Sequence, residues 1–130
     1  MRKQSGFNLM ELLVVVAIIG ILGSIGYSSY SGYVLEARRG EAATRLLQLA
    51  QSQEKFYLDN NAYATSVSAL GFTSTTTNDG NYAITISNST GNQDYVITAT
   101  ATSTGKQSAD TSCAALVVDH KNQRTPTTCW

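Results

Sequence analysis

The strongest pattern in the sequence is an apolar run of about 20 residues near its beginning. The run extends from Phe7 to Tyr27 and contains one ionisable side chain, Glu11. A helix of about 20 apolar residues is long enough to cross a bilayer. The residues before it are polar and basic, and include Arg2 and Lys3. The pattern therefore predicts a membrane-spanning helix with one carboxylate near its start.

An amphipathic helical pattern continues directly from this run. One helical face carries side chains three and four positions apart, at Ala42, Leu46, Leu49, Gln53 and Phe56. No proline interrupts the chain from Phe7 to Leu58, and the turn-favouring residues Asp59-Asn60-Asn61 follow. We expect one helix of about 50 residues, roughly 75–80 Å long at the usual rise per residue. Its second half should lie against a folded domain.

In the second half of the chain, apolar side chains recur at every second position. A loop over residues 60–80 ends in Asp79-Gly80, a strong turn signal. Alternating apolar and polar side chains then predict strands over residues 82–87, 95–102 and 114–120, separated by turn regions at 88–92 and 103–112. Residues 121–123 turn the chain again, and residues 124–130 run back. The expected fold class is α+β, one long helix packed across a small antiparallel sheet.

Composition narrows the possible functions. Nine basic and nine acidic side chains balance each other, which argues against wholesale electrostatic binding of nucleic acid. The two cysteines, Cys113 and Cys129, lie near the C-terminus of a chain that carries an export signal. Cysteine pairs in oxidising compartments form disulfides, so we expect this pair to be bonded. Two cysteines and the distant His120 do not make a metal-binding set. We expect no metal and no cofactor.

Glu11 needs a partner. A carboxylate in the bilayer costs roughly 2.5–3.5 kcal/mol at mid-membrane on insertion scales, and less near a helix end. No Lys, Arg or His lies within helical reach of it in the apolar run. An amine would become available on Phe7 if the chain were cut after Gly6. The sequence thus suggests a processed N-terminus and a carboxylate that pairs with an amine of another subunit.

These features resemble the type IV pilin family. The resemblance lies in the short basic leader ending in Gly6, then Phe7, then Glu11, then the apolar run. It implies a prepilin with a class III leader, cut between Gly6 and Phe7 by a prepilin peptidase and N-methylated on Phe7. It also implies that Glu11 neutralises a neighbour's terminal amine during assembly. The implied fold is the type IV pilin fold with its C-terminal disulfide.

A looser resemblance extends over the second half of the chain. The passages Gln53-Glu54-Lys55-Phe56-Tyr57 and Asn60-Asn61-Ala62-Tyr63-Ala64, with the final Cys129-Trp130, are similar to the minor pilins of the PilE and ComP-like group. The resemblance implies a structural subunit, not an enzyme, that supports pilus biogenesis, adhesion, twitching motility or DNA uptake. No nucleophile-elbow, phosphate-loop or dinucleotide motif argues otherwise.

The expected division of the chain is a cleaved leader at 1–6, a membrane and filament-core helix half at 7–28, and a globular domain at 29–130. By resemblance, the precursor is a single-pass protein of the inner membrane with a periplasmic domain, and the mature subunit belongs to an extracellular pilus. Its expected partners are other pilin subunits, the prepilin peptidase, the inner-membrane assembly platform and, before assembly, the membrane.

Alternatives remain at this stage. A DNA-receptor pilin for natural transformation would need phosphate contacts, for which the candidates are Lys106, Lys121 and Arg124 with His120. A solvated surface with ordinary lysines is the favoured account of these cations, and a terminal Trp130 is expected to pack on the core. A pseudopilin of a type II secretion system shares the N-terminal motif but often lacks the C-terminal disulfide. The major pilin, a plain membrane anchor and a cleaved secretory signal peptide are further alternatives.

Overall fold

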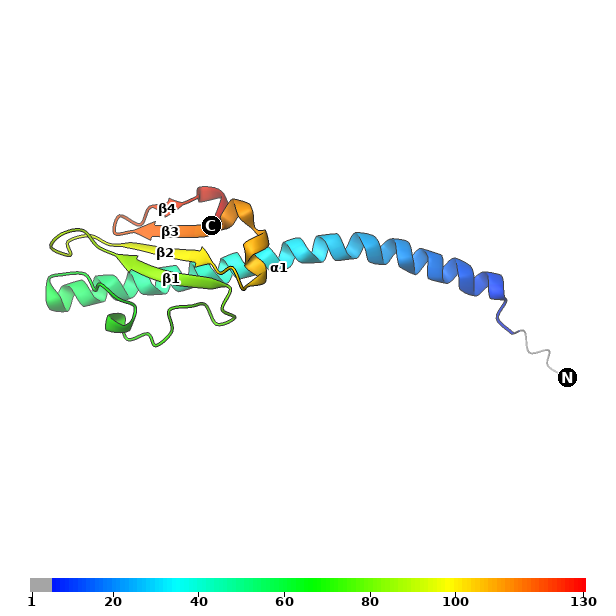
Figure 1. Ribbon diagram of the computed structural model, residues 1–130, viewed down its shortest axis with the longest axis horizontal. Coiled ribbons are helices and arrows are strands. Elements are labelled where there is room, and N and C mark those ends of the chain that lie inside the picture. Colours follow the sequence, from blue (N-terminus) through cyan, green and yellow to red (C-terminus); the bar gives the residue numbers. More distant parts are fainter. Residues whose placement is uncertain (1–5) are drawn as a thin grey trace. The chain divides into compact units, whose positions relative to one another are not determined.

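The computed structural model describes residues 6–130, so most of the expected leader lies outside the described part. The chain forms helix α1 (Leu9–Asn60) and strands β1 (Tyr82–Ser87), β2 (Val96–Ala101), β3 (Ala115–Asp119) and β4 (Arg124–Thr125) (Figure 1). Short 3-10 helices occupy the connections: η1 (Ser68–Leu70), η2 (Lys106–Ala109), η3 (Thr111–Cys113) and η4 (Thr127–Cys129). Its contacts divide the chain into an N-terminal unit that ends at Val34 and a compact unit, Leu35–Trp130.

Helix α1 is the predicted long helix, shifted by two residues at each end. Asn8 sets the start, since its side-chain oxygen accepts a hydrogen bond from the backbone amide of Met10 at 3.4 Å. At the other end, the side-chain amide of Asn60 donates to the carbonyl of Phe56, and Asn61 adopts a left-handed φ of 53°. Asparagine is one of the few residues that take this conformation readily, so the helix stops there.

The four strands form one antiparallel sheet in the order β1-β2-β3-β4. Ile84 pairs with Ala99, and Ala99 in turn pairs with Leu116, so the apolar positions of three strands lie on one face. The predicted alternation is thereby confirmed: Ile84, Ile97, Ala99, Leu116 and Val118 are buried. Two regions expected to be plain turn or loop contain short 3-10 helices, namely residues 103–112 and 60–80.

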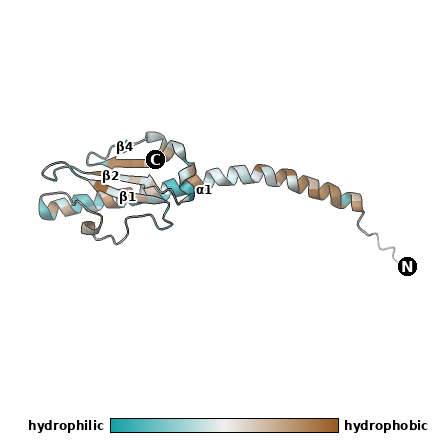
Figure 2. Cartoon of the chain, in the orientation of Figure 1, coloured by the Kyte–Doolittle hydropathy of each residue, from teal (hydrophilic) through white to brown (hydrophobic). Residues whose placement is uncertain are grey.

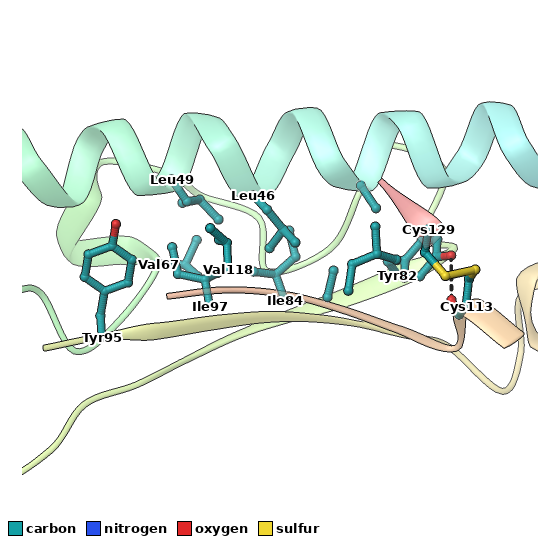
Figure 3. Packing of buried hydrophobic residues seen from close by; sticks show 13 residues of the cluster. Leu46, Leu49, Val67, Tyr82, Ile84, Tyr95, Ile97, Cys113, Val118 and Cys129 are labelled. Atoms are coloured by element: carbon teal, nitrogen blue, oxygen red, sulfur yellow. Dashed lines mark hydrogen bonds between the residues drawn. A yellow bond between two sulfur atoms is a disulfide. The ribbon is translucent and has the colours of Figure 1, made fainter. Parts of the chain in front are cut away.

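The core of the compact unit lies between this sheet face and the second half of α1. Figure 3 shows Leu46 and Leu49 of the helix directed toward Ile84, Ile97 and Val118 of the sheet. Gln53, a polar member of the same helical face, is fully buried. Its amide group donates to the carbonyl of Ala64 and accepts from the amide of Ala64, both at 2.8 Å. The buried glutamine therefore satisfies its polar atoms by fastening the loop that follows α1.

Candidate functional sites

The first candidate site is the apolar half of α1. Large side chains from Phe7 to Tyr33 stay exposed, including Phe7 at 81% and Tyr27 at 79%. Figure 2 shows that hydrophobic residues dominate the beginning of α1. None of its most apolar 18-residue segment is buried. By length and composition this helix could cross a membrane. An uncovered apolar surface of this size is not stable in water, so it has to meet lipid or protein.

The residues expected to be processed lie at the beginning of this half. Gly6 and Phe7 precede the first turn of α1, and both are exposed. Glu11 is an acidic residue in the first helical turn. Across residues 6–130 the structure contains one ion pair, and Glu11 is not part of it. The carboxylate is thus without a cation within the described chain, as the sequence led us to expect.

The second candidate site is a polar trough in the compact unit. One wall is a face of α1, made by Leu47, Ala50, Gln51 and Glu54, and the other is the connection between β3 and β4, made by His120, Lys121, Asn122 and Arg124. Tyr95 completes the lining. The volume of the polar trough is about 510 Å³. It is open to solvent and brings together residues more than 60 positions apart in the sequence.

Only some of the cations proposed as DNA contacts from the sequence line the polar trough. His120, Lys121 and Arg124 line it together. Lys106 begins η2, which follows the end of β2. That end of β2 pairs with the start of β3, whereas the β3–β4 connection follows the end of β3. Lys106 therefore lies at the opposite end of the sheet and is not part of the trough.

Trp130 lies where an aromatic lid on the core was expected. It is partly buried and packs against the core cluster. Its indole nitrogen donates to the carbonyl of Thr125 at 3.4 Å. The guanidinium of Arg124 lies 5.4 Å from the centre of the ring, within the range of a cation–π interaction. Trp130 thus orients one of the trough's cations, a role that the sequence did not reveal.

An aromatic row borders the trough on the side of Glu54. The rings of Tyr57 and Tyr63 lie 4.6 Å apart, those of Tyr63 and Tyr95 4.8 Å, and those of Tyr95 and His120 6.5 Å. The hydroxyls of Tyr63 and Tyr95 each donate to Glu54 Oε1 at 3.4 Å. Both phenols are protonated donors at neutral pH, and burial raises the pKa of each further above its ordinary value.

The disulfide between Cys113 and Cys129 is present, and it joins residues with a sequence separation of 16. It closes a loop that holds β3, β4 and their connection, and so fixes the cationic wall of the trough. The Tyr82 hydroxyl donates to the carbonyl of Cys113 at 3.2 Å and ties this loop to β1. Within residues 6–130, no group of three or more His, Cys, Asp or Glu side chains could hold a metal ion.

Sequence reasoning missed one partly buried ion pair. Arg39 of α1 contacts Asp110, with Nη2 donating to Oδ1 at 2.7 Å. Only 4% of the Asp110 side chain is exposed, and Gln107 Nε2 donates to its other oxygen at 2.8 Å. The hydrogen bond to Asp110 raises the pKa of the Arg39 guanidinium. The two residues lie far apart in the chain, and nothing in the local pattern pairs them.

Comparisons with known proteins agree with this architecture. Residues 28–117 match the family described as "Type IV minor pilin ComP, DNA uptake sequence receptor". Residues 1–27 match the prokaryotic N-terminal methylation motif. No curated protein matches the chain.

A solved structure supports the same assignment. A type IV pilin from Shewanella oneidensis aligns with a TM-score of 0.58 and 26% sequence identity, over 74% of this chain and 97% of that one. The pilin fold predicted from the sequence is therefore confirmed. Because the ComP family match spans more than half of the chain, the protein belongs to the ComP family of type IV minor pilins.

Proposed function

We propose that the protein is a minor subunit of a type IV pilus that assembles through the apolar half of α1 after cleavage between Gly6 and Phe7. The observation that carries this proposal is an uncovered apolar helix half in which Glu11 is the one ionisable residue between Phe7 and Tyr27. Cleavage frees the amine of Phe7, which is then N-methylated. Glu11 of an incoming subunit pairs with that amine on a neighbour.

The pairing favours the transfer of each subunit from the membrane to the filament. A carboxylate near one end of a membrane helix is costly, and an opposite charge at short distance in a low-dielectric core offsets that cost. Both groups exist once per subunit, so every subunit offers an amine and a carboxylate. A repeated head-to-tail contact of this kind builds an open filament.

We further propose the surroundings in which this happens. The precursor lies in the inner membrane with the leader at the cytoplasmic side and the domain in the periplasm. The prepilin peptidase and the assembly platform act on it there. The chain divides into a leader at 1–6, a helix half at 7–28 and a globular domain at 29–130. The compact unit, Leu35–Trp130, lies inside the third part.

Mass spectrometry of sheared surface filaments tests this proposal. The expected result is a peptide that begins at N-methylated Phe7, at low abundance relative to the dominant pilin. Recovery of the chain only in the inner membrane, uncleaved or absent from filaments, would contradict it. Dominant abundance would instead identify a major subunit.

A second function is favoured by the family match together with the polar trough. The ComP family is described as a DNA uptake sequence receptor, and the trough gathers Lys121, Arg124 and His120 on one wall. We propose that the protein binds DNA for uptake during natural transformation, with phosphate contacts from Lys121 and Arg124. Two phosphate contacts supply weak, salt-sensitive binding, which suits a receptor present on a filament.

The DNA proposal is tested with the full chain in a non-ionic detergent. Fluorescence anisotropy should show duplex binding that weakens as salt rises. The slope of the logarithm of affinity against the logarithm of salt should flatten by about one for each phosphate contact removed in Lys121→Ala or Arg124→Ala. Lys55→Ala, an exposed cation of α1 outside the trough, serves as the matched control. Equal binding by all variants would contradict the proposed contacts.

A further inference from the structure

The two walls of the polar trough carry opposite charge. Lys121 and Arg124 lie on the β3–β4 connection, and Glu54 lies on α1. A site for phosphate alone has no use for a carboxylate, which repels the ligand. Resting on the proposed DNA binding, we propose that the trough holds one unpaired nucleotide of a strand. Its two flanking phosphates lie on Lys121 and Arg124, and the amino group of its base lies on Glu54.

The cationic wall is held in place before any ligand arrives. The carboxylate of Asp119 accepts from the backbone amides of Lys121 at 2.9 Å and Gln123 at 2.8 Å. Asn122 takes the left-handed conformation, with a φ of 58°, and its amide donates to the carbonyl of Asp119 at 2.9 Å. Arg124 lies over the ring of Trp130. These contacts reduce the ordering cost of binding a phosphate.

Glu54 is prepared as an acceptor. The hydroxyls of Tyr63 and Tyr95 contact one oxygen of the carboxylate, Oε1, at 3.4 Å, and only Tyr63 contacts the other, at 3.5 Å. An ionised carboxylate has about four acceptor positions, so these long contacts orient it without filling it. The single ion pair found in residues 6–130 is elsewhere, which leaves Glu54 without a cation. Carboxylates accept from the N4 amino group of cytosine.

The size and the apolar lining of the trough fit a nucleotide. Its volume of about 510 Å³ lies in the range of small-molecule sites. Leu47 and Ala50 make part of the α1 wall apolar, and a flat base can lie against it. We take the nucleotide to be unpaired, because a base that has left the stack can lie against this apolar lining while its amino group reaches Glu54. The ligand class is therefore single-stranded or locally opened DNA that carries an amino-bearing base.

The test compares single strands of oligodeoxycytidine and oligothymidine of equal length, labelled with fluorescein, on the full chain in a non-ionic detergent. Cytosine presents an amino group where thymine presents a carbonyl. We expect a preference for the cytidine strand of about fivefold or more, the lower end of what a base-specific contact supplies. Equal affinity for the two strands would overturn the proposal.

Variants separate base discrimination from charge. Glu54→Gln removes the negative charge and introduces an amide that both donates and accepts. We expect tighter binding of both strands and a cytidine-to-thymidine ratio near one. Glu36→Gln makes the same charge change at an exposed position outside the trough, and its ratio should stay that of the wild type. A preserved preference in Glu54→Gln would overturn the proposal, and circular dichroism checks that each variant is folded.

Failure of this inference can be told from failure of the DNA function itself. Salt-sensitive duplex binding without base preference in single strands leaves the receptor function standing and overturns the nucleotide site. Loss of cytidine-strand binding in Lys121→Ala, with Lys106→Ala unchanged, supports the trough as the site. Absence of binding to any DNA removes both the receptor function and the inference that rests on it.

Discussion

The two halves of α1 differ in how the burial of their side chains relates to hydrophobicity. Up to Tyr33 its large side chains are exposed, although they include the most apolar segment of the chain. From Ala42 to Gln53 one face is completely buried, although the sequence there contains more charge. Intrinsic helix propensity makes little distinction between the halves, so burial by the sheet decides which residues stabilise the domain. We therefore expect the first half to contribute to assembly, whereas the second half contributes to the folded core.

The largest effect is expected at Glu11. Removing one partner of a buried charge pair costs about 3–5 kcal/mol, so Glu11→Ala should lower incorporation into filaments about a hundredfold or more. The domain should stay folded, because its core begins at Ala42. Quantitative immunoblotting of sheared filaments against whole cells measures the effect.

Glu36→Ala is the control for this prediction, since it removes an exposed acid that follows the apolar run. It should leave incorporation near that of the wild type. Incorporation of Glu11→Ala into filaments at the wild-type level would contradict the proposed assembly mechanism.

Two leucines of α1 test the difference between its halves. Leu46 is fully buried and Leu22 is 64% exposed, and both lie on α1. Leu46→Ala should lower the free energy of unfolding by about 2–5 kcal/mol through lost burial and the resulting cavity. Leu22→Ala should leave it unchanged within error. Urea unfolding of the two full-length variants in detergent, followed by circular dichroism, measures both, and equal losses would break the distinction between the halves.

The disulfide comes next. Its reduction or the change Cys129→Ser should cost about 3 kcal/mol, because the open chain regains the entropy of the loop closed by this bond. The expected result is a lower thermal midpoint with the same helical content at low temperature. Ser112→Ala, beside Cys113, is the control that alters neither sulfur. An unchanged midpoint after reduction would show that the sheet holds the loop by itself.

The ion pair between Arg39 and Asp110 should contribute somewhat less. Arg39→Ala leaves a buried carboxylate with only Gln107 as partner, at a cost of about 2–3 kcal/mol. The neighbouring Arg38→Ala should be nearly silent, since Arg38 makes no ion pair within residues 6–130. Thermal unfolding at neutral pH compares the two, and equal effects would remove any special role of this pair.

The smallest effect concerns Asp94. Hydrogen bonds from the hydroxyl and the backbone amide of Ser89 lower the pKa of its carboxyl, with the amide at 2.7 Å. A carboxyl whose pKa is lower in the folded than in the unfolded protein stabilises the fold at pH values above its unfolded pKa. This stabilisation is lost as the pH falls through the folded pKa. Asp94→Asn should therefore be slightly less stable at neutral pH and converge with the wild type in acid. If the stability difference between Asp94→Asn and the wild type stayed constant at all pH values, the lowered pKa of Asp94 would not be its cause.

Periodicity predicted most of the fold. The helical face at Leu46 and Leu49 and the alternation at Ile84 and Ile97 are confirmed because burial imposes a period on local sequence. The ends of α1 moved by two residues because caps depend on single side chains such as Asn8. The 3-10 helices were missed because such short turns leave no periodic signal.

The candidate sites were less accessible to sequence reasoning. The motif at Gly6, Phe7 and Glu11 is local, so its residues could be proposed directly. The polar trough joins α1 to the β3–β4 connection, and only the sheet register shows that Lys121 and Arg124 share it whereas Lys106 does not. Glu54 gave no signal at all, because an exposed glutamate on a helix is ordinary in sequence.

The two edge strands of the sheet, β1 and β4, have a consequence for crowding. Strand β4 pairs over two residues and is followed by Pro126, which offers no amide to a further strand. At the other edge, the amide of Ile84 donates to the carbonyl of Thr75, so part of β1 is already covered. Exposed edges invite strand-to-strand aggregation, and both edges here are blunted. Subunits brought to very high local concentration can then associate through helices without fusing through their sheets.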